Sequence, residues 1–122
     1  MIIKTGKSFQ DKVFDLLERG KENAISIDSL VSTIFGTRFI GSLLKGRQIR
    51  KAIEQMREEG TPICSLSTHK GYWLAKNWEE LDEFLAEYES RAYRILHTAS
   101  RMRKAFREEY HQESFQLMEI NG

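Results

Sequence analysis

A heptad repeat of apolar residues in the second half of the chain is the feature that most constrains the fold. The repeat alternates steps of three and four residues, and no proline or glycine occurs from residue 77 to residue 121. This spacing predicts a single helix of about 34 residues, ~50 Å long, that ends near His111. Its apolar positions are Trp78, Leu81, Leu85, Tyr88, Ala92, Ile95, Ala99, Met102 and Phe106.

The apolar stripe of this helix needs a partner. The chain has 122 residues and 40% hydrophobic content, which suits one small domain with an extension and leaves too little surface to cover so long a stripe. A second copy of the chain is the simplest partner, so we predict a homodimer or a higher oligomer. The alternative is that the helix breaks and folds back on its own domain. Further apolar side chains widen the stripe and leave a bundle of more than two helices open: Phe84, Tyr93, Leu96 and Ala105.

The charges of the predicted helix are segregated along its length. Residues 78–89 contain six acids and no base, whereas residues 91–107 contain six bases and no acid. An antiparallel pair of helices would set each acidic block against a basic block, which favours that orientation. Two alternatives stay open. Acids near the N-terminus and bases near the C-terminus also suit the helix dipole, and the basic block can contact nucleic acid.

Two short helices are predicted near the N-terminus. The first begins at Ser8 and stops near Gly20, and the second has Ser26 as its cap and ends at Gly36. The apolar residues of both helices recur at the helical period, so each helix has one face for a core. The residues on these faces are Phe9, Val13, Leu16, Leu17, Ile27, Leu30, Val31 and Ile34.

A third helix is predicted over residues 47–59, with a polar face that is basic at its start and acidic at its end. The preceding segment, residues 37–46, is apolar but interrupted by glycines. We expect a long connection there, which packs Phe39 and either Leu43 or Leu44 on the core. The core-facing residues of the third helix are Ile49, Ala52, Ile53 and Met56.

The stretch PICSLSTHKGYWLAK, residues 62–76, predicts a β-hairpin. Two short apolar runs flank a five-residue loop, Ser67–Gly71, in which the glycine permits a positive φ. Because an isolated hairpin is unstable in water, this hairpin should rest on the three helices. The residues expected to make that contact are Ile63, Leu66, Tyr72 and Leu74.

Three helices followed at once by a hairpin is the order of elements in a winged helix-turn-helix. The predicted fold class is therefore α+β, mainly α with a small hairpin. The winged-helix head would cover residues 1–76, with the hairpin at 62–75 as its wing. An oligomerisation helix at 77–111 and a flexible tail at 112–122 would complete the chain.

The basic start of the third helix favours binding to double-stranded DNA. A helix fits the major groove, where Arg and Lys suit guanine and Gln suits adenine. Cations on the preceding connection and at the hairpin tip suit phosphates. The candidate DNA-binding residues are Arg38, Lys45, Arg47, Gln48, Arg50, Lys51, Thr68, His69 and Lys70. The alternative is a protein–protein adaptor, which the acidic end of the third helix and the net charge of only +1 favour.

Catalytic chemistry is not predicted. His69, His97 and His111 have no acid at the spacing of metal ligands, and no phosphate-binding glycine loop occurs. Cys64, the single cysteine, suits packing in a strand. We therefore expect no enzyme, no cofactor, no metal site and no small-molecule ligand. With no signal peptide or membrane span expected, and one cysteine that suits a reducing interior, we expect a cytoplasmic protein without membrane contact.

Residues 26–76 resemble the biotin-repressor type of winged helix-turn-helix, in which the hairpin ends in Gly-Tyr-x-Leu, here GYWL. Residues 46–97 carry GRQIRKAIEQMREEGTPICS, GYWLAKNWEEL and ESRAYRIL, and are similar to small winged-helix proteins of phages and prophages of Gram-positive bacteria. The resemblance implies DNA binding inside a bacterial host cell, in transcription regulation or DNA replication. It makes GRQIRKAI the recognition helix and Ser67–Gly71 the wing, while the connection at 37–46 is longer than the tight turn of the typical motif. As an adaptor, the chain would belong to a phage replication or packaging complex.

Overall fold

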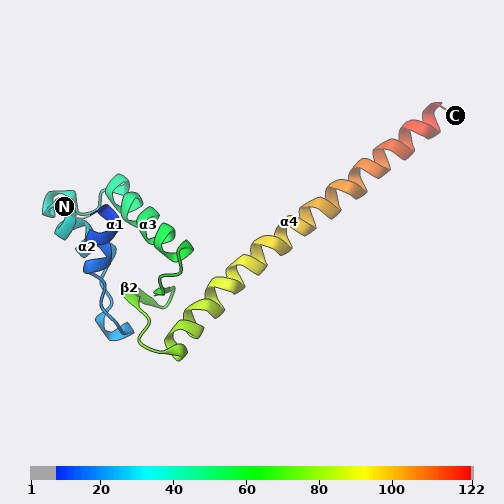
Figure 1. Cartoon of the computed structure of the whole chain (residues 1–122). Helices are drawn as coiled ribbons and strands as arrows, with labels where there is room; N and C mark the ends of the chain where they lie inside the picture. The colour runs from blue at the N-terminus through cyan, green and yellow to red at the C-terminus, as the bar shows by residue number, and fades with distance from the viewer. Residues whose placement is uncertain (1–7, 122) are drawn as a thin grey trace, which may run out of the picture. The chain divides into compact units, whose positions relative to one another are not determined.

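The structure is a computed structural model that describes the backbone of residues 8–121 and the side chains of residues 8–113. It divides into two compact units, Met1–Leu85 and Ala86–Gly122. The first unit, which we call the head, holds three helices, a two-stranded antiparallel sheet and the start of the last helix (Figure 1). The fold is thus mainly helical with a small sheet, in agreement with the α+β class expected from the sequence. No helix in the described part of the chain is long and apolar enough to cross a membrane.

Helix α1 (Phe9–Asp15) begins at the cap expected from the sequence. The Ser8 hydroxyl accepts a hydrogen bond from the Asp11 backbone N–H at 3.1 Å, and the Asp11 carboxylate accepts one from the Ser8 N–H at 3.3 Å. The two bonds form a capping box. The helix ends before Gly20, the stop expected from the sequence, because the backbone of residues 18–20 hydrogen-bonds to Leu74 in the hairpin instead.

Helices α2 (Ile27–Phe35) and α3 (Leu43–Glu58) are joined through a short turn of 3-10 helix at residues 37–39. The caps expected for α2 at Ser26 and Gly36 are confirmed. The expected range of 47–59 for the third helix is wrong at its start, because α3 begins four residues earlier. There the Ser42 hydroxyl accepts a hydrogen bond from the backbone N–H of residue 45 at 3.2 Å. The connection is correspondingly shorter than the predicted segment 37–46.

The three helices enclose one apolar core, and Phe39 packs against it as expected. Leu43 and Leu44 do not, since they are 80% and 61% exposed, so the expectation that one of them packs on the core is wrong. The reason is the early start of α3: the helical period that turns Gly46 and Ile49 inward turns residues 43 and 44 outward. The buried core residues are Val13, Leu17, Leu30, Val31, Ile49, Ala52, Ile53, Met56, Ile63 and Leu74.

The hairpin consists of strands β1 (Ile63–Leu66) and β2 (His69–Leu74). The predicted five-residue loop is wrong, because β2 begins at His69 and only residues 67–68 form the turn. The positive φ expected at Gly71 is present, at 106°, but inside β2. An added Cβ there would lie 2.8 Å from the Ile25 carbonyl oxygen, so glycine lets β2 approach the segment before α2.

Strand β2 has hydrogen-bonding partners on both of its edges. It pairs with β1 on one side, and on the other Tyr72 exchanges two backbone hydrogen bonds with Ile25, at 2.8 and 2.9 Å. The Leu74 carbonyl also accepts a bond from the Gly20 N–H at 2.9 Å. The hairpin is therefore held to the α1–α2 segment by backbone bonds as well as by side-chain packing.

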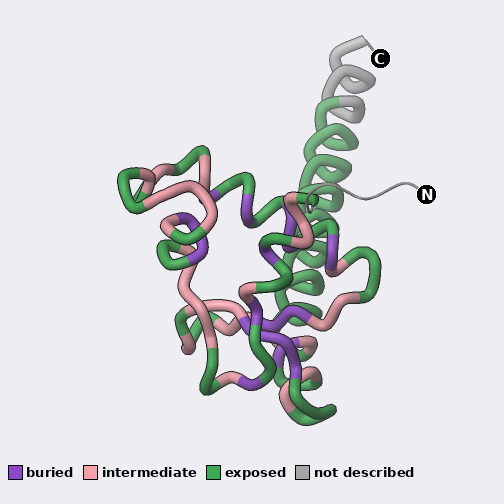
Figure 2. The backbone as a smooth tube through the Cα atoms, turned by 60° about the vertical axis from the view of Figure 1, so that its left-hand side comes forward, coloured by how far each residue is buried: buried purple, intermediate pink, exposed green. Residues whose placement is uncertain are grey.

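The two faces of the hairpin bury against different parts of the chain. Ile63, Tyr72 and Leu74 face the three-helix core as expected. Leu66 does not, because side chains alternate along a strand and Leu66 lies three residues from Ile63, so it joins the opposite face with Cys64 and Trp73. Both faces are covered, and Figure 2 shows the buried segments gathered in the head.

Helix α4 (Trp78–Asn121) covers the second face with its first turns. Phe84 is buried against Trp73, and Leu81 and Leu85 pack beside it, so these three apolar residues contact the head of their own chain. The helix does not break. It runs ten residues past the end expected near His111, since no glycine or proline stops it, and residues 112–121 of the predicted tail are helical (Figure 1).

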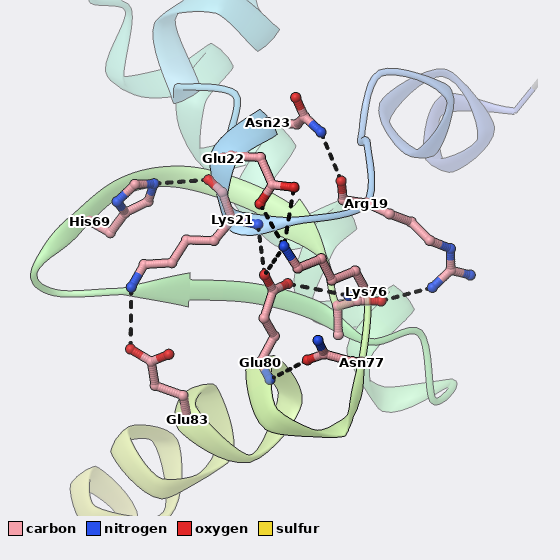
Figure 3. Close-up of polar contacts among 10 residues, drawn as sticks. Arg19, Lys21, Glu22, Asn23, His69, Lys76, Asn77, Glu80 and Glu83 are labelled. Carbon is pink, nitrogen blue, oxygen red and sulfur yellow. Dashed lines mark hydrogen bonds and ion pairs between the residues drawn. The ribbon is translucent and has the colours of Figure 1, made fainter.

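A polar network fixes the start of α4 to the turn before α2 (Figure 3). The Asn77 side-chain oxygen accepts a hydrogen bond from the Glu80 N–H at 2.9 Å, the cap expected from the sequence. The Glu80 carboxylate accepts bonds from the backbone N–H groups of Lys76 and Lys21, at 3.2 and 3.1 Å. The Lys21 ammonium also pairs with Glu83 at 3.3 Å. Two acids of the first acidic block are therefore engaged within the head.

Arg57 connects three elements of the head. Its guanidinium donates to the Ile63 carbonyl at 2.9 Å and to the Ser65 hydroxyl at 3.1 Å, both on β1. The same group lies 4.6 Å from the centre of the Phe84 ring on α4 and pairs with Glu54 on its own helix at 3.0 Å. One cation therefore joins α3, β1 and α4.

We expect Arg57→Ala to destabilise the head by about 2–3 kcal/mol, because it leaves the Ile63 carbonyl without its charged donor and uncovers the Phe84 ring. Urea unfolding followed by tryptophan fluorescence measures the change. Arg91→Ala is the control: its 3.4 Å pair with Glu87 is exposed on α4, and its loss should shift stability by no more than about 0.5 kcal/mol. Equal shifts for the two variants would contradict the role given to Arg57.

Candidate nucleic-acid interface

The first half of α3 presents a basic outer face. Its inner face is buried, so the helical period turns the polar residues of this half outward. Arg47 lies one helical turn before Arg50 and Lys51, and the three cations therefore share one side of the helix. Gln48 is exposed beside Lys51. The structure brings together the four α3 residues that the sequence predicts for base contact.

The charge around this face has a single sign. Residues 29–53 contain five cations and no acid. Farther along α3 the exposed charge is acidic, at Glu54 and Glu58, while Arg57 turns inward to the hairpin. The outer surface of α3 therefore changes from basic to acidic along the helix, with the basic part at its N-terminal end.

Arg38 lies on the connection before α3 as expected, whereas Lys45, expected on that connection, lies in the first turn of α3 because the helix starts early. Both cations contact aromatic rings. The Lys45 ammonium is 4.6 Å from the centre of the Phe35 ring and 5.4 Å from that of Phe39. The Arg38 guanidinium is 4.8 Å from the centre of the Phe39 ring. Since Phe35 and Phe39 pack on the core, these contacts hold both cations near the basic face of α3.

The hairpin contributes two of its three candidate residues to the surface, Thr68 from the turn and Lys70 from β2. Thr68 and Lys70 are exposed, and Lys70 lines a shallow hollow with Ser26 and Ser29 at the start of α2. His69 instead turns toward the head. Its ring Nε2 lies 3.0 Å from the Lys21 carbonyl oxygen (Figure 3), and its ring packs edge-on against Trp73 at 5.3 Å between centres.

An apolar group beside the basic face was missed in the sequence. Ile40, Leu43 and Leu44 are all more than half exposed and lie immediately before and within the first turn of α3. The signal that could have found them is Ser42, a good helix cap, because a helix that starts there turns both leucines outward. The candidate surface is therefore basic with an apolar margin.

The stripe of α4 divides between the two units. Leu81 and Leu85 pack in the head, whereas Trp78 is 77% exposed. In the second unit the residues of the stripe are exposed, including Ile95, Met102 and Phe106 at 64–69%. Figure 2 shows this part of α4 as an exposed helix. The remaining predicted oligomerisation residues, Tyr88, Ala92 and Ala99, are also exposed.

Of the groups considered for catalysis, His97 and His111 are exposed on α4, and Cys64 is covered. Cys64 is fully buried on the second face of the hairpin, and burial raises the pKa of its thiol to about 11. The thiolate, the reactive form, is therefore scarce at neutral pH. Within residues 8–113, no three His, Cys, Asp or Glu side chains are grouped so that they could hold a metal ion.

Comparisons of the chain with models of protein families, with curated proteins and with solved structures found no match.

We expect Cys64 to react about 100-fold more slowly with an aromatic disulfide reagent at pH 8 in the folded protein than in denaturant, because both burial and the raised pKa suppress the thiolate. The rate is measured from the absorbance of the aromatic thiolate that the reagent releases. Because the pKa in the folded state lies above that in the unfolded state, the protein should also lose stability as the pH rises from about 9 to 11. Equal rates in the two states would mean that Cys64 is an accessible nucleophile.

Proposed function

We propose that this chain is a self-associating protein that binds double-stranded DNA through a winged helix-turn-helix head. The basic outer face of the first half of α3, formed by Arg47, Arg50 and Lys51, is the observation that carries the proposal. In this proposal α3 is the recognition helix and the hairpin is the wing. Binding is an equilibrium recognition of duplex DNA without chemistry on it.

The dimensions and charges of α3 support this assignment. A single helix fits the major groove, and its N-terminal turns are the part that reaches base edges. Arg47 and Arg50 suit the acceptors of guanine, and Gln48 suits adenine. The acidic second half of α3 would repel phosphates and so favours entry by the N-terminal half.

Phosphate contacts would come from both sides of α3. Arg38 and Lys45, held on aromatic rings, flank its start, and Lys70 and Thr68 are exposed on the hairpin. These residues carry no sequence information but fix the position of the helix on the duplex. The inward bonds of His69 leave Thr68 and Lys70 as the proposed wing contacts.

Self-association is proposed for the second unit. Its apolar stripe is exposed over several helical turns, and an apolar surface of this length usually marks an interface. A dimer would place two heads on one DNA molecule and favour repeated or inverted sites. The sequence resemblance suggests a regulator of transcription or a replication factor of a phage or mobile element, acting in the cytoplasm of a bacterial host.

We expect the triple variant Arg47→Ala, Arg50→Ala, Lys51→Ala to lower duplex affinity at least about 10-fold at ~50 mM salt. Because three phosphate or base contacts are removed, the slope of log affinity against log salt concentration should also fall in magnitude by about 3. Fluorescence anisotropy with labelled duplexes measures both quantities. Circular dichroism confirms that each variant is folded.

The matched control removes three cations from the outer face of α4, with Arg94→Ala, Arg101→Ala and Lys104→Ala. It changes net charge by the same amount, so retained binding in the control and lost binding in the first variant would locate the contact on α3. A larger loss in the control would transfer the contact to the basic block of α4. Equal affinities for wild type and both variants would refute DNA binding through either surface.

A second candidate function is that of a protein–protein adaptor in a phage replication or packaging complex. The observation that favours it is the exposed apolar group at Ile40, Leu43 and Leu44, where a DNA-reading helix usually presents polar residues. In this case the start of α3 would fill an apolar pocket of a partner protein, and the basic residues around it would contact acidic groups on that partner.

Leu43→Ser with Leu44→Ser separates the two functions. If the head binds DNA, we expect this variant to change duplex affinity by less than about threefold, because both residues are uncharged and the salt-dependent contacts remain. The same anisotropy assay measures this change. A loss as large as that of the triple cation variant would mean that the leucines lie in the contact itself.

A further inference from the structure

The exposed seam of α4 has defined ends. On its N-terminal side the preceding seam position is Leu85, which packs in the head. On its C-terminal side the next heptad positions are Glu109 and Glu113, which cannot continue an apolar seam. The exposed seam therefore has six positions: Tyr88, Ala92, Ile95, Ala99, Met102 and Phe106.

We propose that the second unit of α4 pairs antiparallel with that of a second copy of this chain, in the register that sets Tyr88 opposite Phe106 of the other copy. The proposal rests on the self-association part of the proposed function, and not on DNA binding. In this register Ala92 lies opposite Met102 and Ile95 lies opposite Ala99, and the twofold axis falls near residue 97.

The sizes of the seam residues favour this pairing. Each alanine of one copy meets a large side chain of the other, and the two aromatic residues meet at the ends of the seam. A parallel pair would instead stack Ala92 on Ala92 and Ala99 on Ala99, which leaves two layers with too little volume to fill the interface. The antiparallel arrangement fills every layer with one complementary pair.

The register is fixed by what lies beyond the seam. Sliding one helix by a heptad in one direction brings Leu81 and Leu85 into the seam, although both already pack in the head. Sliding it in the other direction sets Glu109 against Ala92 and Glu113 against Tyr88, which would bury carboxylates in an apolar seam. The proposed register avoids both the loss of packing in the head and the burial of carboxylates in the seam.

Charge complementarity points the same way. In an antiparallel pair the residues that follow the d positions of the heptad face one another across the seam. In the proposed register these are Glu89 of one copy and Arg103 of the other, twice by symmetry, both exposed in the single chain. In a parallel pair Glu89 would face position 84, which is buried in the head.

On the other side of the seam, the residues that precede the a positions of the heptad face one another, and no like charges meet there. Arg91 would face Ala105 of the other copy, and its own partner is Glu87 of the same chain, at 3.4 Å. The remaining cations of the basic block, at positions 94, 101, 104 and 107, lie on the outer side of the pair. Two basic blocks can therefore pair closely without strong repulsion, because several positions beside the seam are uncharged. These positions are Leu96, Thr98 and Ala105.

The proposed pairing sets the distance between the two Leu85 residues along the helix axis. Residue 85, the last of the head, would be level with residue 109 of the other copy, so the two Leu85 residues would be ~36 Å apart along the axis at 1.5 Å per residue.

A charge-reversal cycle tests the pairing. Sedimentation equilibrium of the full chain should give a dimer. Glu89→Arg or Arg103→Glu alone should raise its dissociation constant by about 10-fold or more, and the double variant should restore it to within about threefold, because the pair is remade with opposite polarity. The two positions lie ~21 Å apart in one helix, so coupling between them must act between copies.

Cross-linking tests the register in a Cys64→Ala background. With a short bismaleimide linker, Thr98→Cys should link to itself near the twofold axis, whereas Met102→Cys should not, since its equivalents would be ~15 Å apart. Linking of Met102→Cys alone would establish a parallel pair and overturn the proposal. A chain that stays monomeric at ~100 μM, far above the association range of a useful dimer, would overturn it as well.

These experiments distinguish failure of the proposed pairing from failure of the proposed DNA binding by the head. A dimer with the expected cross-link that binds no duplex keeps this inference and refutes the proposed function of the head. Duplex binding by a chain that fails both the charge-reversal and cross-linking tests keeps the head's function and refutes the pairing.

Discussion

The alternation of side chains along a short hairpin is the constraint on which the rest of the structure depends. Ile63 and Leu74 point to the three-helix core, and Cys64 and Trp73 point to α4, so one two-stranded sheet has no face left for solvent. A lone hairpin of this length is unstable in water. Here it becomes stable as the middle layer of the head, and Arg57 fastens this layer to the helices on either side.

This arrangement also divides α4 into two parts with different tasks. The periodicity of the apolar stripe is continuous from Trp78 to Phe106, yet Leu81 and Leu85 are used by the head. The part beyond the head keeps its apolar stripe exposed over several turns, whereas in the head part of α4 Trp78 is the exposed position of the stripe. A continuous sequence pattern therefore does not imply a continuous interface, because the chain's own core can take the first repeats.

Local signals predicted the fold where they were sufficient. Ser8, Ser26, Gly36 and Asn77 marked helix ends correctly, because caps act over three or four residues. The outward basic residues of α3 were also predictable, since the helical period alone sets them. The inward turn of His69 toward Lys21 was not predictable, because it follows from a distant contact that no local pattern encodes. The face taken by Leu66 could have been predicted, because strand alternation sets Leu66 opposite to Ile63. The early start of α3 was also marked locally, by Ser42, but the glycines of the segment obscured that signal.

The structure gives the acidic residues at the start of α4 a role within their own chain that the sequence did not indicate. The contrast between its acidic and basic blocks favoured an antiparallel pair, but Glu80 and Glu83 bind to the head through residues 21 and 76. Two acids of the block are therefore used within the head, and the contrast between the whole blocks is a weak guide to orientation. Beyond the head the block holds Glu87, which pairs with Arg91 of the same chain, and Glu89, which has Arg103 as its counterpart across the seam. An antiparallel pair is therefore favoured by the opposite charges of Glu89 and Arg103 and by the small volumes of the alanines between them, and not by the summed charges of the two blocks.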